Sequence, residues 1–356
     1  MRGWRSNWMW LGALLALVLV LGGCFRSPTQ AVIGLSGIAG TVPWTVTFDA
    51  TGSTGPDGIT TTHWEFGEED ESYEASGTFV FQHAGTFTVR LTVRAADGST
   101  DVEETTVEVA PAVWVADENL NTVYRLSMTG AVLDSFALPA TEPGGLALAV
   151  AEGKTWLFVA CMNGGNQRIL RMDPVTGTVD ETYRAPAQSP LHLTYNTNGQ
   201  KQIWHVDGLS RKIYRLNPPD LQVYESFGQT YFKATSPQVT NVPFLREPQG
   251  LDWTPEGSIA GSLWYLEGET AKLYEMTVIP GYDIMSNTQL QVTGDPVTLD
   301  AGVVPVSGID IYDGAIWVVD LNRHRIVELD LTTGLATGKQ IAGFPGSRAV
   351  GLEIQY

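Results

Sequence analysis

The stretch VSGIDIYDGAIWVVDLNRHRIVELDLTTG, residues 306–334, decides the fold, because it returns in weaker form at four other places in the chain. Three of its segments alternate apolar and polar residues, and Asp313-Gly314 between the first two tolerates the positive φ of a tight hairpin. Such alternation places one face of each segment on a core and the other in water, which predicts three antiparallel strands. A fourth, weaker strand is expected near residues 339–342. Four strands that recur every few tens of residues are typical of a β-propeller blade.

The repeat is clearest in the second strand of each unit and in the residue that ends it. The aligned quartets are Trp114-Val115-Ala116-Asp117, Phe158-Val159-Ala160-Cys161, Trp204-His205-Val206-Asp207, Trp264-Tyr265-Leu266-Glu267 and Trp317-Val318-Val319-Asp320. The first unit lacks a first strand, whereas residues 350–355 form a spare one at the C-terminus. We therefore expect residues 350–355 to pair with residues 113–116 and close the ring, which removes an open sheet edge. Five blades is the preferred count, and six is the alternative if the insertion at residues 231–246 forms one more.

The N-terminus has the order of a secretory signal. Arg2 and Arg5 precede an apolar run at residues 11–21, and the run ends in Leu21-Gly22-Gly23-Cys24. This ending resembles the signal of bacterial lipoproteins. The resemblance implies that residues 1–23 are removed and that Cys24 is acylated as the mature N-terminus.

On that resemblance the protein is attached through lipidated Cys24 to a membrane of the bacterial cell envelope. Phe25 rather than an aspartate follows the cysteine, which implies the outer membrane, with a periplasmic or surface-facing chain. The alternative is an uncleaved membrane anchor, since the apolar stretch at residues 8–23 is nearly long enough to span a bilayer. Residues 24–31 are expected to be a short tether.

Residues 32–110 have a different pattern from the repeats. Short alternating segments separated by turn residues predict a small β-sandwich. The motifs Phe48-Asp49-Ala50-Thr51-Gly52-Ser53 and Trp64-Glu65-Phe66-Gly67-Glu68-Glu69 resemble the PKD domain, an immunoglobulin-like module. Trp64 is predicted to be a core residue, because large aromatic side chains fill sandwich interiors. The acidic run at residues 68–71 has the composition of a solvated loop and lacks the spacing of a calcium loop.

The remaining residues, 111–356, are expected to form the propeller. The stretch Asp320-Leu321-Asn322-Arg323-His324-Arg325-Ile326 is close to the repeat pattern of the NHL family and the related gluconolactonase group. The resemblance implies an all-β fold. It does not transfer a function, since propellers include enzymes, scaffolds and sensors.

Charge and cysteine content exclude some classes of function. The formal net charge of −18 repels phosphate backbones, so a nucleic-acid partner is not expected. With Cys24 lipidated, Cys161 is the one remaining cysteine, so no disulfide can form within the chain. Cys161 ends an apolar segment and is predicted to be a buried small side chain.

Residues that would support catalysis are missing from the expected places. Lactonases that the propeller resembles hold a divalent metal through acidic and amide residues before the glycine of a first strand. Here Gln249 and Ser307 stand at those positions, and they are poor ligands for hard cations. The five histidines show no metal-binding spacing, and no nucleophile or phosphate-binding motif is present. We expect no catalytic residue, no metal and no cofactor.

Four repeat-equivalent acids are the candidate site residues of the propeller rim: Asp117, Asp207, Glu267 and Asp320. They could form a ring that binds a cation. The alternative is structural, because an acid at a strand end commonly accepts hydrogen bonds from the amides of the next turn.

Two functions therefore remain. The preferred one is an envelope-anchored, non-catalytic protein whose propeller binds a protein or glycan partner while the sandwich acts as a spacer. The alternative is an extracytoplasmic hydrolase or lyase that acts on a small or polysaccharide substrate in the axial pocket. A cluster of His, Asp or Glu side chains at one mouth of the channel would favour the enzyme.

Overall fold

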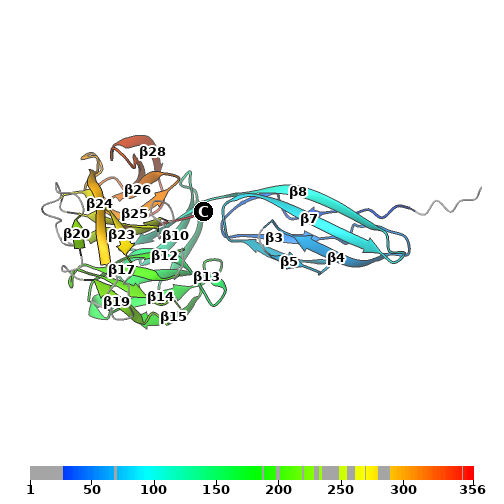
Figure 1. Cartoon of the computed structure of the whole chain (residues 1–356), viewed down its shortest axis with the longest axis horizontal. Coiled ribbons are helices and arrows are strands. Elements are labelled where there is room, and N and C mark those ends of the chain that lie inside the picture. Colours follow the sequence, from blue (N-terminus) through cyan, green and yellow to red (C-terminus); the bar gives the residue numbers. More distant parts are fainter. Residues whose placement is uncertain are drawn as a thin grey trace, which may run out of the picture.

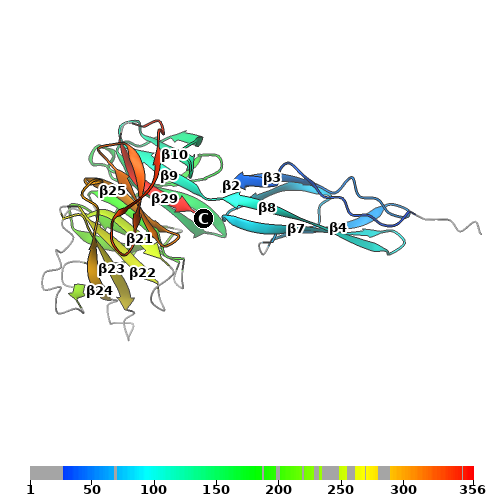
Figure 2. The same ribbon diagram turned by 90° about the horizontal axis from the view of Figure 1, so that it is seen from above.

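The structure is a computed structural model. It describes residues 27–356 except 68–69, 187, 198–200, 219, 228–231, 235–247, 255–260, 269, 280–288 and 347. Figures 1 and 2 show a small elongated β-sandwich beside a ring of sheets, with the C-terminus of the chain at the junction between them. The described residues contain no helix that is long and apolar enough to cross a membrane. The predicted signal, Cys24 and the apolar stretch at residues 8–23 lie outside the described residues.

The N-terminal unit is a sandwich of two sheets. One sheet has the order β1 (Gly34–Leu35), β3 (Trp44–Asp49), β6 (Ser76–Phe81). The other has the order β2 (Ala39–Thr41), β8 (Thr100–Ala110), β7 (Gly85–Ala95), β4 (Ile59–Glu65), β5 (Glu71–Ser72). The alternating residues of these strands point into the space between the sheets, as the period of two requires.

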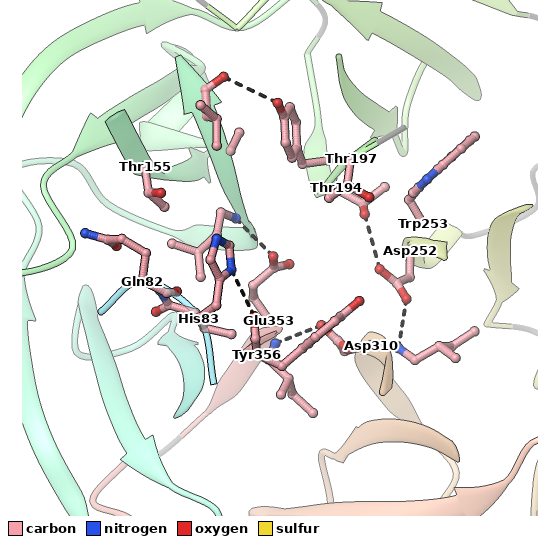
Figure 3. A pocket seen from close by; sticks show the side chains of 17 residues that line it. Gln82, His83, Thr155, Thr194, Thr197, Asp252, Trp253, Asp310, Glu353 and Tyr356 are labelled. Carbon is pink, nitrogen blue, oxygen red and sulfur yellow. Dashed lines mark hydrogen bonds between the residues drawn. The ribbon is translucent and has the colours of Figure 1, made fainter. Parts of the chain in front are cut away.

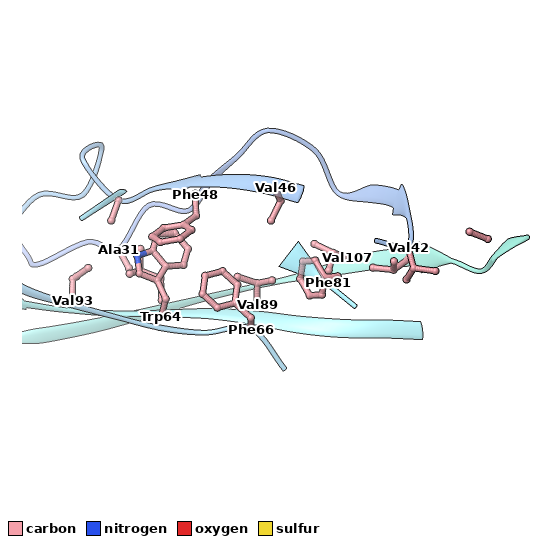
Figure 4. Close-up of a cluster of buried hydrophobic side chains, with 14 residues drawn as sticks. Ala31, Val42, Val46, Phe48, Trp64, Phe66, Phe81, Val89, Val93 and Val107 are labelled. Atoms are coloured by element: carbon pink, nitrogen blue, oxygen red, sulfur yellow. The ribbon is translucent and has the colours of Figure 1, made fainter. Parts of the chain in front are cut away.

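Aromatic side chains fill the sandwich core. Trp64 is completely buried, and its ring packs against Phe48, with ring centroids 5.1 Å apart, and against Phe66, with centroids 6.1 Å apart. Figure 4 shows these rings between the two sheets. The prediction that Trp64 is a core residue is confirmed. Of the acidic run, Glu68 and Glu69 lie outside the described residues, and Glu71 bonds to His63 and Tyr73.

The rest of the chain forms five sheets among the described residues, each built from consecutive antiparallel strands except where the chain ends meet and where one short edge strand is added in parallel. The first four sheets, in chain order, are β12 (Pro143–Ala151), β13 (Lys154–Cys161), β14 (Arg168–Met172), β15 (Val179–Arg184); β16 (Pro190–Tyr195), β17 (Ile203–Asp207), β18 (Lys212–Leu216), β19 (Val223–Phe227); β21 (Pro248–Thr254), β22 (Ser262–Glu267), β23 (Lys272–Ile279), β24 (Gln289–Thr298); and β25 (Val306–Tyr312), β26 (Ala315–Asp320), β27 (Arg325–Asp330), β28 (Ala336–Ala342). The weak fourth strand expected near residues 339–342 is the end of β28.

The two ends of this region share the remaining sheet, whose order is β29 (Ala349–Gln355), β9 (Ala112–Asp117), β10 (Thr122–Ser127), β11 (Val132–Ala137). Leu352 pairs with Val115 in its register. The innermost strands β12, β16, β21, β25 and β29 contact one another in that order, and β29 contacts β12. The ring is therefore closed by the C-terminal strand, as predicted from the spare first strand. The short strand β20 (Phe232–Ala234), the described part of the insertion, adds an outer edge to β24.

Glycines let the innermost strands approach one another closely at the axis. A Cβ on Gly351 would collide with the backbone oxygen of Gly144 on the neighbouring inner strand. A Cβ on Gly250 would collide with the side chain of Ile309. Only a residue without a side chain fits at these positions, which explains the glycine at the third residue of β21 and of β29.

Candidate functional site

Three acidic side chains occupy equivalent positions on three innermost strands. Asp252 lies opposite Trp264, Asp310 opposite Trp317, and Glu353 opposite Trp114 in the strand registers. The tryptophans are the repeat-equivalent residues that open the second-strand quartets, so the three acids also correspond to one another. The same position is Thr194 on β16 and Ala147 on β12. The ring therefore gathers three carboxyl groups from strands that are far apart in sequence.

Each acid binds the backbone of the next inner strand around the ring. The amide of Ile311 donates to Asp252 Oδ2 at 2.8 Å, and the amide of Ile354 donates to Asp310 Oδ2 at 2.8 Å. The amide of Leu148 donates to Glu353 Oε1 at 3.0 Å. The acceptor therefore lies one inner strand before its donor in all three cases. These bonds hold the carboxyl groups in fixed positions.

A further hydrogen bond extends this arrangement to a fourth strand. The hydroxyl of Thr194 on β16 lies 3.2 Å from Asp252 Oδ1. Both oxygens of Asp252 thus have partners, and the side chain bridges β16 and β25. Figure 3 shows Thr194, Asp252, Asp310 and Glu353 around one cavity.

Burial raises the pKa values of these three carboxyl groups. It raises the pKa of Asp252 to about 7, against the lowering effect of the Ile311, Trp253 and Thr194 hydrogen bonds. Burial also raises the pKa of Asp310 well above its usual value, and the charges of Asp252 and Glu353 add to the increase. Burial also raises the pKa of Glu353 well above its usual value, the Leu148 hydrogen bond opposes this increase, and the charge of Asp252 adds to it. Several carboxyl groups close together in a largely buried site disfavour more than one negative charge.

The three acids line a cavity at the axis of the ring, with a volume of about 210 Å³. Its apolar wall includes Trp253, Ile311 and Tyr356. None of the lining residues in the described part of the chain is a lysine or an arginine. The sandwich also contributes to the lining, through Gln82 and His83 between β6 and β7. The cavity therefore combines acidic groups, aromatic surface and a wall from the other domain.

The four predicted rim acids are each buried under a turn. Asp117 accepts hydrogen bonds from the amides of Leu120, at 2.7 Å, and Arg348, at 2.9 Å. Asp207 accepts from the amides of Ser210 and Ser189, and Glu267 accepts from the amide of Thr270. Asp320 accepts from the amides of Asn322 and Arg323 and from the Arg325 guanidinium. Their contacts support the structural interpretation, and none of them lines the axial cavity in the described residues.

The other singled-out residues also have structural surroundings. The Ser307 hydroxyl donates to the backbone oxygen of Ala349 at 3.2 Å and so joins β25 to β29. Gln249 is partly exposed on β21. Cys161 is free and fully buried, as predicted, and burial raises the pKa of its thiol to about 12. Among the described residues, no group of three His, Cys, Asp or Glu side chains is arranged to hold a metal ion.

The histidines do not gather at one point. His192 and His205 are buried, and burial lowers their pKa values to about 3 and about 4. His63 contacts Glu71 at 3.1 Å on the sandwich, and His324 lies in a turn with positive φ. His83 alone of the five lines the axial cavity.

Sequence reasoning did not find Asp252, Asp310 and Glu353. A signal was present, because each acid comes two residues after an inner-strand glycine: Gly250-Leu251-Asp252, Gly308-Ile309-Asp310 and Gly351-Leu352-Glu353. In an alternating strand such a residue is ordinarily interpreted as facing solvent. An innermost strand of a ring has no solvent face, so here the polar position faces the axis.

Comparison with known proteins identifies a family for the N-terminal unit. Residues 31–110 match the family model of the PKD domain. No curated protein matches the chain in sequence. A structure of a nidogen/laminin complex is similar with a TM-score of 0.49 and 14% identity, over 69% of this chain and 99% of that one. The PKD1 domain of the Vibrio cholerae metalloprotease PrtV is similar with a TM-score of 0.21 and 29% identity, over 23% of this chain and 96% of that one.

An inactive virginiamycin B lyase from Staphylococcus aureus, in complex with quinupristin, is similar with a TM-score of 0.36 and 14% identity, over 88% of this chain and 96% of that one. The family match and the closed ring of sheets together define an all-β protein in which a PKD domain precedes a β-propeller.

Proposed function

We propose that this chain is a lipid-anchored protein of the bacterial cell envelope whose five-bladed propeller binds a small organic cation in its axial cavity without transforming it. One observation carries the proposal: the carboxyl groups of Asp252, Asp310 and Glu353 meet in a cavity that also has an aromatic and aliphatic wall. Cavities of this kind are the usual ligand sites of folded proteins.

The chemistry of the lining favours a positively charged ligand. Carboxylates accept hydrogen bonds, and an ammonium group would offset the cost of ionising acids that are out of water. Apolar contact with Trp253 and Tyr356 suits an organic cation, because aromatic faces attract cations and also cover hydrocarbon. At about 210 Å³ the cavity has room for a small organic molecule.

The experiment is calorimetric titration of the full chain with cyclohexylamine and with its neutral analogue cyclohexanol. Cyclohexylamine is expected to bind, and its affinity is expected to rise from pH 6 to pH 8, because the ammonium group displaces protons from the acids. The double variant Asp310→Asn/Glu353→Gln keeps an oxygen for each backbone amide and is expected to bind at least about tenfold more weakly. The matched control is Glu74→Gln, at an exposed position of the sandwich. Equal binding of the alcohol and the amine would overturn the proposal.

The anchor is proposed from the signal and Cys24, and the outer membrane is its proposed location. The test is membrane fractionation of the wild type beside Cys24→Ser. The wild type is expected in the membrane fraction and the variant in the soluble envelope fraction. Unchanged fractionation of the variant would refute the lipid anchor. A protein or glycan partner for the outer loops of the propeller remains a separate prediction, to be tested by purification of the anchored chain from envelope extracts.

A hydrolase or lyase is the second candidate, because acids converge on the cavity in the manner that would favour an enzyme. Carboxyl groups that stay protonated near neutral pH can donate a proton to a leaving group. Incubation of the wild type and Glu353→Gln with envelope metabolites tests this candidate. Repeated consumption of one metabolite beyond the amount of protein, in the wild type alone, would replace binding with catalysis.

A further inference from the structure

We infer that the corner of the sandwich between β6 and β7, formed by Gln82 and His83, is a wall of the axial site that limits the size of the ligands that reach the carboxyl groups. The identity of those ligands rests on the proposed function, whereas the inference that the corner covers the cavity is independent of it. The sandwich is then a specificity-determining part of the site in addition to a spacer.

The position of the cavity along the inner strands supports this inference. The lining begins at the level of the acids and continues toward the C-terminal ends of the strands, as in the runs 148–150 on β12 and 353–356 at the end of the chain. The sandwich lies at this end, since Figures 1 and 2 both place the C-terminus at the junction. Gln82 and His83 therefore lie at the mouth on the sandwich side.

Hydrogen bonds join the corner to the residues that follow Glu353. The side-chain amide of Gln355 donates to the backbone oxygen of Gln82 at 2.9 Å. The other end of this amide, Gln355 Oε1, accepts from the indole nitrogen of Trp114 at 3.1 Å. His83 Nδ1 lies 3.4 Å from the backbone oxygen of Tyr356. The corner is thus bonded to the closing strand two and three residues beyond one of the cavity acids.

A second set of contacts places the whole sandwich. Arg125 on β10 donates to the backbone oxygens of Pro43, at 2.7 Å, and Thr41, at 3.4 Å, at the near end of the sandwich. Ala112, the first residue of β9, packs in the core of the sandwich. Strand β8 ends at Ala110, so Pro111 alone separates the two domains. These contacts hold the corner over the mouth in one position.

The first test needs no ligand. The variant Gln82→Ala/His83→Ala shortens both side chains but keeps the backbone oxygen that Gln355 binds. A water-soluble carbodiimide with glycine ethyl ester is used to label carboxyl groups, and peptide mass spectrometry measures the labelling rates of Asp310 and Glu353. We expect both rates to rise at least about fivefold in the variant, while the exposed Glu74 serves as an internal reference and Gln188→Ala as the surface control. Unchanged rates, in a variant with the wild-type melting curve, would overturn the inference.

The second test measures size selection by calorimetry with cyclohexylamine and the larger 2-(1-naphthyl)ethylamine. The wild type is expected to prefer the smaller amine, and the ratio of the two affinities is expected to shift by at least about tenfold toward the larger amine in the double variant. An unshifted ratio would overturn size selection by the corner. If the wild type binds neither amine, the proposed ligand class is wrong, and size selection among such ligands is wrong with it. The labelling rates would still decide whether the corner covers the cavity.

Discussion

The carboxyl group of Asp252 on β21 and the backbone amide of Ile311 on β25 are joined by a hydrogen bond of 2.8 Å across the axis-facing side of the ring. The bond connects two innermost strands that belong to different sheets. Asp310 and Glu353 make the same kind of bond to the strands that follow them. The acids therefore brace the centre of the propeller as well as lining its cavity. Their burial also makes the stability of the protein depend on pH in an unusual direction.

The pH dependence of stability is expected to change in Asp252→Asn. The folded-state pKa of Asp252, about 7, is above the value of 3.8 of the free side chain. Between these two pKa values the folded protein keeps a proton that the unfolded chain releases. The contribution of this carboxyl group to the free energy of unfolding is therefore largest below about pH 4 and is lost as the pH rises toward 7. The shift corresponds to roughly 4 kcal/mol at pH 8, since one pKa unit is about 1.4 kcal/mol.

Urea denaturation at pH 4 and pH 8 measures this effect. Asparagine keeps an oxygen for the Ile311 amide, so the variant is expected to be more stable than the wild type at pH 8, with a much smaller difference at pH 4. Glu74→Gln, at an exposed position, is the matched control and should show neither change. Parallel stability curves for Asp252→Asn and the wild type would show that Asp252 is ionised in the folded protein.

Glu353 is expected to stabilise the ring through its oxygen and not through its charge. Glu353→Leu removes the acceptor of the Leu148 amide and leaves a partly buried donor without its partner, which costs about 1–3 kcal/mol. Glu353→Gln keeps an acceptor and is expected to be close to the wild type or more stable at neutral pH. Denaturant unfolding of the two variants compares them directly. Equal losses of stability in both would mean that the charge matters and the hydrogen bond does not.

Asp117 tests the distinction between turn acids and cavity acids. Its carboxylate accepts from the amides of Leu120 and Arg348, which joins the turn after β9 to the segment before β29. Asp117→Ala is expected to cost about 1–3 kcal/mol, because two partly buried amides lose their acceptor, and to leave the binding of cyclohexylamine by the folded protein unchanged. Unfolding curves measure the loss of stability, and calorimetry measures the binding of cyclohexylamine. A selective loss of binding with wild-type stability would return Asp117 to the candidate ligand site.

The sequence predicted the propeller because its evidence is local and repeated. All five second-strand quartets open with an aromatic residue and four of them end in an acid. Strand alternation is a property of neighbouring residues. The position of β29 beside β9 was also predictable, since a missing first strand at one end matches a spare one at the other. The PKD motifs around Phe48 and Trp64 located the sandwich core for the same reason.

The site was not predictable because it exists only once the sheets have closed into a ring. Asp252 and Glu353 are about one hundred residues apart and meet only where the inner strands converge. The repeated acids Asp117, Asp207, Glu267 and Asp320 gave a stronger pattern, yet that repetition reflects a turn that four of the five sheets share. The contribution of Gln82 and His83 had no sequence signal, since it follows from the position of one domain against the other.

Close approach of the inner strands makes a final prediction about Gly351. A Cβ at this position would collide with the backbone oxygen of Gly144 on β12, and a backbone atom in a closed ring cannot move aside easily. Gly351→Ala is therefore expected to destabilise the protein by on the order of 3 kcal/mol, as overpacked cores do. Gly37→Ala is the matched control, because its Cβ would meet Trp44 at an ordinary contact distance of 3.5 Å. Thermal unfolding of both variants decides the matter: if Gly351→Ala melts with the control, β29 does not close the ring against β12 as tightly as the structure shows.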